Sequence, residues 1–172
     1  LENIDLHGGM GIFEPQGRNT AAAVAVAAQV ALADGDLLAL VVPSDHEITT
    51  TADFWKTIES GVEAAKAGRI VVFGIPPAHP ETGYGYIEAG TAFDGREDRD
   101  VRRFVEKPDS QKAESYLAAG NYFWNAGIFL FRGSVMRDAF LAHAPEIWSG
   151  VEKAMAGAER DETGLYLPEA DY

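Results

Sequence analysis

The sequence contains no cysteine among its 172 residues, so disulfide bonds and thiolate chemistry are excluded. It also lacks an apolar run long enough for a membrane-spanning helix, because Gln29 and Asp34 interrupt the longest Ala/Val-rich stretch. The N-terminal residues LENIDLHGGMG show neither the basic segment nor the apolar core of a secretory signal. These absences predict a cytoplasmic protein that does not associate with a membrane.

Basic residues are also scarce: the sequence has 14 Lys and Arg but 27 Asp and Glu, which gives a net charge of −13. General nucleic-acid binding depends on a basic surface that displaces phosphate counterions, so no nucleic-acid partner is expected. A single nucleotide remains compatible with this charge. Backbone N–H groups, one or two basic side chains and a divalent cation suffice to hold its phosphates.

Hydrophobic residues make up 47% of the chain and charged residues 24%, which is ordinary for a globular domain. The hydrophobic pattern predicts strands at 10–13, 37–43, 70–75, 84–88, 101–107 and 122–131, and helices at 18–33, 52–67, 110–119, from 134 and from 145. The strand–helix–strand order before residue 76 favours a right-handed βαβ unit. We therefore expect one α/β domain with a mixed, mostly parallel sheet.

The apolar run LALVVP stops at a polar corner, Ser44-Asp45-His46-Glu47. In open α/β sheets the ligand crevice lies outside the carboxyl ends of the strands, and an Asp there can bind Mg²⁺ together with waters and substrate phosphates. The alternative is a turn in which Ser44 and Asp45 bond only to nearby backbone. His46 is assigned no catalytic role.

Three further stretches interrupt the scaffold next to expected strand or helix ends. EPQGRNTA precedes a helix whose N-terminus favours an anion, and HPETGYGY has glycines that allow a ligand close to the backbone. FVEKP and NYFWNAG supply an acceptor, a cation and an amide for a phosphorylated sugar. The alternatives are a capped turn, a tight turn and a surface ion pair, respectively.

Together, in this order, these stretches resemble the sugar-nucleotide pyrophosphorylases and, more narrowly, the bacterial mannose-1-phosphate guanylyltransferases. FVEKP is shared by many sugar nucleotidyltransferases, whereas RNTA with PSDH and HPETGYGYI is more specific. The resemblance runs from about residue 12 to the last residues. It implies a Rossmann-like nucleotidyltransferase sandwich that transfers GMP from GTP to mannose 1-phosphate, giving GDP-mannose and pyrophosphate.

The resemblance also implies roles for individual residues. Asp45 would be the Mg²⁺ ligand and, with Lys107, a catalytic residue. The nucleotide-binding residues would be Glu14, Arg18, Asn19 and Thr20. The sugar-phosphate pocket would be formed by Gly85, Glu106, Lys107 and Asn125. The reaction needs no covalent intermediate, so the protein would act by positioning both substrates and neutralising their charge.

Two parts of the family pattern do not match. The G-x-G-[ST]-R signature loop has no counterpart, and we interpret the glycine-rich residues 1–11 as a leader or linker before a partial nucleotidyltransferase domain at 12–172. The family's second metal-binding Asp lies in an S-[IF]-D-Y-A segment. Asp171 is not expected to replace it, because LYLPEADY is more similar to the helical stretch before that segment.

We therefore expect a fragment truncated at both ends. Two other functions remain open from the sequence: a non-catalytic sugar-nucleotide-binding fragment or pseudo-enzyme, and a related nucleotidyltransferase that uses another base or hexose 1-phosphate. Exposed strand edges and apolar helix faces at the truncation surfaces predict self-association into a homo-oligomer.

Overall fold

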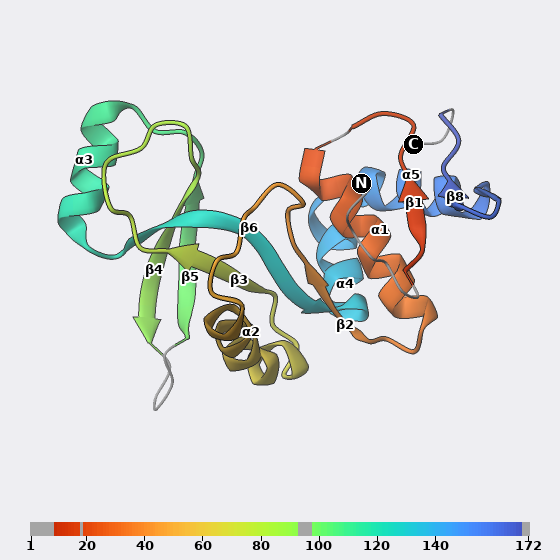
Figure 1. Cartoon of the computed structure of the whole chain (residues 1–172), viewed down its shortest axis with the longest axis horizontal. Coiled ribbons are helices and arrows are strands. Elements are labelled where there is room, and N and C mark those ends of the chain that lie inside the picture. Colours follow the sequence, from red (N-terminus) through yellow and green to blue (C-terminus); the bar gives the residue numbers. More distant parts are fainter. Residues whose placement is uncertain (1–8, 18, 93–97, 170–172) are drawn as a thin grey trace. The chain divides into compact units, whose positions relative to one another are not determined.

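The computed structural model describes residues 9–17, 19–92 and 98–169, and the chain forms two compact units (Figure 1). One unit, here called the terminal unit, combines Leu1–Leu37 with Gly133–Tyr172. The other, the central unit, is the continuous segment Leu38–Arg132. The predicted leader at 1–11 lies largely outside the described residues, and its boundary stays a prediction, although a strand already begins at Gly11.

The terminal unit consists of helices and a small sheet. Its helices are α1 (Asn19–Ala33), α4 (Gly133–His143) and α5 (Pro145–Ala156). Its strands β1 (Gly11–Phe13), β7 (Glu159–Arg160) and β8 (Gly164–Tyr166) form a sheet in the order β1-β8-β7. β1 pairs with β8 in parallel, and β7 pairs with β8 antiparallel. Leu165 and Tyr166, which begin the stretch LYLPEADY, thus lie in a strand, whereas the family resemblance likened this stretch to a helical one.

Helix α1 is buried because alanine and valine cover nearly its whole circumference. Ala25 and Ala28 are completely inaccessible to solvent. Because these side chains are small, the first residue of α4 packs against the backbone of α1. A Cβ placed on Gly133 would lie 2.9 Å from the Ala28 carbonyl oxygen. Any larger residue at position 133 would therefore push the two helices apart.

Among its described residues, the central unit contains a five-stranded sheet and two helices. The strands are β2 (Leu38–Val41), β3 (Val71–Ile75), β4 (Tyr86–Ala92), β5 (Arg99–Val105) and β6 (Tyr122–Arg132). The helices are α2 (Thr51–Lys66) and α3 (Ser110–Ala119). The strand order is β2-β6-β4-β5, and β3 also pairs with β6. Figure 1 shows β6 as the long strand that crosses this unit.

The predicted α/β class with mixed strand pairing is confirmed, but parallel pairing is less common than expected. All strand pairs described in the central unit are antiparallel. β2 and β3 run in the same direction, as a βαβ unit requires, yet each forms its hydrogen bonds with β6. The eleven residues of β6 are long enough to pair with three strands, which the local sequence pattern does not reveal.

Two clusters of buried side chains form the core of the central unit. In the first, Ile58 of α2 packs against Ala126, Ile128 and Leu130 of β6. In the second, Ala113 of α3 packs against Tyr86 and Tyr122. The two helices thus hold different parts of the sheet. Within the residues that the structure describes, no helix combines the length and apolar character needed to cross a membrane.

Candidate functional site

Three residues that the sequence assigns to one pocket meet in the central unit. Gly85 directly precedes β4, Glu106 directly follows β5, and Asn125 lies in β6. The backbone N–H of Asn125 donates to the Gly85 carbonyl at 2.8 Å. A Cβ placed on Gly85 would lie 3.1 Å from Glu106 Oε2 and 3.6 Å from Asn125 Cβ. These residues, called the Gly85 cluster below, are thus in contact distance although they are far apart in sequence.

The polar groups of the Gly85 cluster have complementary hydrogen-bonding roles. Asn125 Oδ1 accepts from the backbone N–H of Gly127 at 3.1 Å, which orients the amide so that Nδ2 is its donor side. The Glu106 carboxylate, when ionised, can only accept. A hydroxyl group both donates and accepts, so this pair of side chains suits a sugar with neighbouring hydroxyls.

Lys107 extends the cluster toward solvent. Its Nζ lies 3.7 Å from Glu106 Oε1, and both side chains are mostly exposed. The surface ion pair considered from the sequence therefore exists, and such a pair contributes about 0–1 kcal/mol. Lys107 also adopts a left-handed φ of 41°, which is rare for a residue other than glycine. Its ammonium group is accessible to an anionic ligand.

Asp45 lies on the exposed loop that follows β2. This loop contacts β6 where it begins: Pro43 Cγ lies 3.3 Å from the Cβ position of Gly127, which is two residues after Asn125 in the chain. Across the described ranges, no group of three or more His, Cys, Asp or Glu side chains could hold a metal by itself. A single exposed carboxylate fits Mg²⁺, which keeps several waters and completes its shell with substrate phosphates.

The proposed nucleotide-binding residues lie in the terminal unit, between β1 and α1. Glu14 follows β1 directly, and Asn19 and Thr20 open α1; all three are exposed. Although the residue as a whole is exposed, desolvation of its carboxyl by the surrounding chain raises the pKa of Glu14 above its ordinary value. Asn19 has a φ of 61°, a conformation that asparagine tolerates better than most residues. Arg18 lies outside the described residues.

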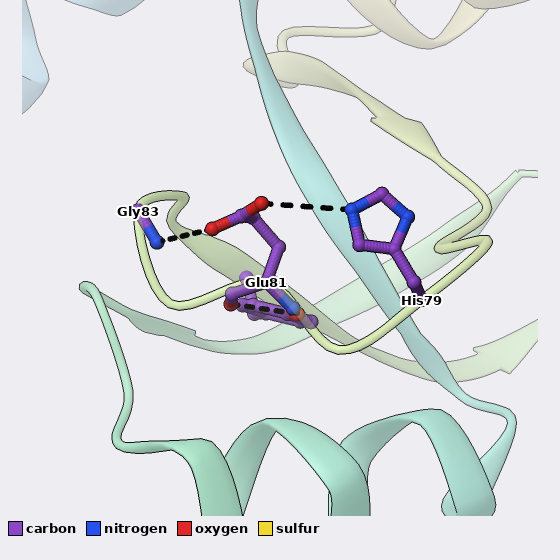
Figure 2. A network of polar contacts seen from close by, with 4 residues as sticks. His79, Glu81 and Gly83 are labelled. Atoms are coloured by element: carbon purple, nitrogen blue, oxygen red, sulfur yellow. Dashed lines mark hydrogen bonds and ion pairs between the residues drawn. The ribbon is translucent and has the colours of Figure 1, made fainter.

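A polar network that the sequence analysis did not predict lies before Gly85 (Figure 2). Glu81 Oε1 accepts from the backbone N–H of Gly83 at 2.8 Å, and Glu81 Oε2 lies 3.5 Å from His79 Nε2. These bonds lower the pKa of Glu81, with the Gly83 N–H as the largest cause. The sequence did contain a signal for this turn: in PETG, the carboxylate of Glu81 stands two residues before Gly83.

Comparison with protein families identifies the class of this domain. Residues 10–165 match the model of the nucleotidyl transferase family, and the chain belongs to this family. The resemblance found from the sequence motifs is thereby confirmed.

Individual proteins with similar sequences narrow the resemblance within this family. The chain is 48% identical over 151 residues to the xanthan biosynthesis protein XanB of Xanthomonas campestris, covering 87% of this chain and 32% of that protein. It is 47% identical to a mannose-1-phosphate guanylyltransferase of Sinorhizobium fredii, covering 87% and 30%, and 42% identical to one of Escherichia coli, covering 87% and 33%. The chain thus spans about a third of the length of these relatives.

Two solved structures share the fold. A mannose-1-phosphate geranyltransferase from Thermus thermophilus matches with a TM-score of 0.77 at 36% identity, over 86% of this chain and 43% of that one. A mannose-6-phosphate isomerase from Helicobacter pylori matches with a TM-score of 0.82 at 32% identity, over 93% and 62%.

Proposed function

We propose that this chain carries part of the active site of a mannose-1-phosphate guanylyltransferase, which transfers GMP from GTP to mannose 1-phosphate. The observation that supports it most is the Gly85 cluster, which joins a carboxylate acceptor, an amide donor and a glycine at one point. Relatives that bear this enzyme's name are 42–47% identical to the chain over 87% of its length.

The hexose phosphate binds at the Gly85 cluster in this proposal. Glu106 accepts a hydrogen bond from one mannose hydroxyl, and Asn125 Nδ2 donates to another. Gly85 leaves room for the sugar, since a Cβ at this position would already lie 3.1 Å from the Glu106 carboxylate. The exposed ammonium group of Lys107 neutralises the phosphate charge and thereby assists catalysis.

GTP binds through the segment between β1 and α1, with Glu14, Arg18, Asn19 and Thr20 as its contacts. Asp45 is the carboxylate that would hold Mg²⁺, which when bound supplies positive charge to the phosphates. A mannose 1-phosphate oxygen attacks the α-phosphorus of GTP; the new P–O bond forms as the bond to the pyrophosphate oxygen breaks. Binding of the substrates and neutralisation of their charge would account for catalysis, since no covalent intermediate is needed.

The test combines binding and turnover on the same preparation. GDP-mannose and, in parallel, UDP-glucose are titrated calorimetrically in the presence of Mg²⁺, and pyrophosphate release from GTP and mannose 1-phosphate is followed in a coupled assay. Selective binding of GDP-mannose with pyrophosphate release is the expected result. Binding of neither nucleotide sugar contradicts the proposal.

Asp45→Ala is the matched test of the metal assignment. We expect it to reduce turnover at least about 100-fold, because it removes the carboxylate that holds the charge-neutralising cation. The control is Glu59→Ala, which removes an exposed carboxylate from α2 and leaves turnover unchanged. Normal turnover in Asp45→Ala would show that this residue does not hold the metal.

A second candidate is sugar-nucleotide binding without turnover, for which the hydrogen-bonding groups of the Gly85 cluster would suffice. Binding of GDP-mannose without pyrophosphate release would support it. Preference for UDP-glucose would instead indicate a transferase for another base or hexose. We further propose a cytoplasmic location, on the basis of the cysteine-free sequence, and self-association of the chain, which is argued in the Discussion.

A further inference from the structure

The segment from Pro76 to Gly85 connects β3 to β4 without forming a helix or strand. In this segment the Tyr86 hydroxyl bonds to the backbone of Glu81, as a neighbouring strand would do in a sheet. It accepts from the Glu81 N–H at 2.9 Å and donates to the Glu81 carbonyl at 3.0 Å. Tyr86 is completely buried, so these two bonds fix the middle of the segment to the core.

The Glu81 carboxylate joins the two halves of the segment. One oxygen closes the turn by accepting from the Gly83 N–H, and the other faces the imidazole of His79 (Figure 2). His79 and Tyr84 both meet Trp124 edge-on, with ring centroids 5.0 Å and 5.5 Å from the indole. Trp124 thus contacts this segment at two points, His79 and Tyr84.

This arrangement places Glu81 next to the backbone that builds the Gly85 cluster. Tyr84, at one end of the segment, directly precedes Gly85, and Trp124 directly precedes Asn125. The 2.8 Å hydrogen bond from Asn125 to Gly85 joins the same two chain segments. A shift of the turn therefore changes the position of Gly85 relative to Asn125 and Glu106.

We propose that Glu81 is a positioning residue for the hexose end of the site: by closing the turn at Gly83 and facing His79, it fixes the segment 79–85 on Trp124 and so sets the place of Gly85. Glu81 does not contact the substrate in this scheme. The inference rests on the proposed function, because it assumes that the Gly85 cluster binds the hexose phosphate.

Two variants of Glu81 and one control variant test this role. Glu81→Ala removes both bonds of the carboxylate and is expected to weaken GDP-mannose binding about tenfold, the equivalent of one charge-assisted hydrogen bond. Glu81→Gln keeps an oxygen acceptor for the Gly83 N–H, so we expect it to restore most of the affinity. Glu59→Ala on α2 removes an exposed carboxylate elsewhere in the central unit and serves as the control.

The measurements are calorimetric titrations with GDP-mannose and with GDP, and amide exchange at Gly83. A positioning role for the hexose end weakens GDP-mannose binding in Glu81→Ala and leaves GDP binding unchanged, whereas general unfolding weakens both. Faster exchange at Gly83 in the same variant shows that the turn has opened, and this readout does not depend on any ligand.

Three results overturn the inference in distinguishable ways. If the unaltered chain binds GDP-mannose and Glu81→Ala binds it equally well, the positioning role is wrong and the proposed function stands. If the unaltered chain does not bind GDP-mannose, the proposed function fails and the inference that rests on it fails too. Equal loss of GDP and GDP-mannose binding in Glu81→Ala also contradicts a role at the hexose end.

Discussion

Lys107 combines an accessible charge with a backbone conformation that costs free energy. Its φ of 41° lies in the left-handed region, where a side chain costs about 1–2 kcal/mol relative to glycine. Its ion pair with Glu106 is exposed and offsets little of this cost. Strained residues of this kind concentrate at binding sites, where the conformation directs a side chain or the backbone toward a ligand.

Replacing Lys107 by glycine and by alanine separates its conformational role from its charge. Both variants lose the ammonium group, so we expect mannose 1-phosphate affinity to fall about tenfold in each. Only glycine relieves the backbone, and Lys107→Gly should be about 1 kcal/mol more stable than Lys107→Ala in urea unfolding. Equal stability of the two variants would show that the conformation is not strained.

At the scale of secondary-structure elements, a network of three side chains joins β4, β5 and β6. Arg103 Nε donates to Glu88 Oε2 at 2.7 Å, and the Tyr122 hydroxyl donates to the same oxygen at 2.9 Å. These bonds lower the pKa of Glu88 from its ordinary value of 4.5, with the Tyr122 bond as the largest cause and Arg103 next. The ionised carboxylate therefore stabilises the sheet.

The pH dependence of this contribution follows from the direction of the pKa change. A carboxyl whose pKa is lowered on folding contributes its full stability above the unfolded pKa, and the contribution is lost as pH falls through the lower, folded value. We expect Glu88→Gln to reduce the melting temperature at pH 7 and to show a weaker decline below about pH 4.5. Thermal melts across this range, with Glu59→Gln as the control, measure both effects. Identical pH profiles of Glu88→Gln and the unaltered chain would contradict the role of the network.

Local sequence signals predicted the helices better than the strand pairing. Asp109 accepts from the Lys112 N–H at the start of α3, and Gly120 ends that helix with a φ of 71°, so both boundaries follow from neighbouring residues. The antiparallel partners of β6 depend on contacts between distant segments, which periodicity does not report. The short strands β7 and β8 contain too few residues to show an alternating pattern.

In the candidate site, too, residues in recognisable motifs were predicted, whereas a residue whose role depends on the folded backbone was not. Gly85, Glu106 and Asn125 were found through motifs, and they lie together in the structure, while their roles stay predictions. Glu81 was missed, because its role depends on a turn that brings its carboxylate to the Gly83 N–H and on a buried Tyr86 hydroxyl. Such groups become visible only when the backbone path of the loop is known.

At the scale of the whole molecule, the edge of the central sheet is the basis for the proposed self-association. β5 lies at one end of the described strand order, and its side chains Val101 and Phe104 are 41% and 54% exposed. An exposed edge strand with apolar side chains offers unpaired backbone groups and hydrophobic area to a second copy of the chain. The two-fold pairing of identical strands is the simplest closed arrangement.

We therefore expect the chain to associate in a concentration-dependent way and Phe104→Lys to weaken this association. A lysine on an edge strand opposes pairing, since it would bring like charges together in a symmetric contact and remove apolar area. Gln111→Lys adds the same charge at an exposed position on α3, outside the edge strand, and should leave association unchanged. Sedimentation velocity over a range of concentrations measures the effect. A monomer at all concentrations contradicts self-association itself, whereas equal association of Phe104→Lys and the unaltered chain places the contact on a surface other than β5.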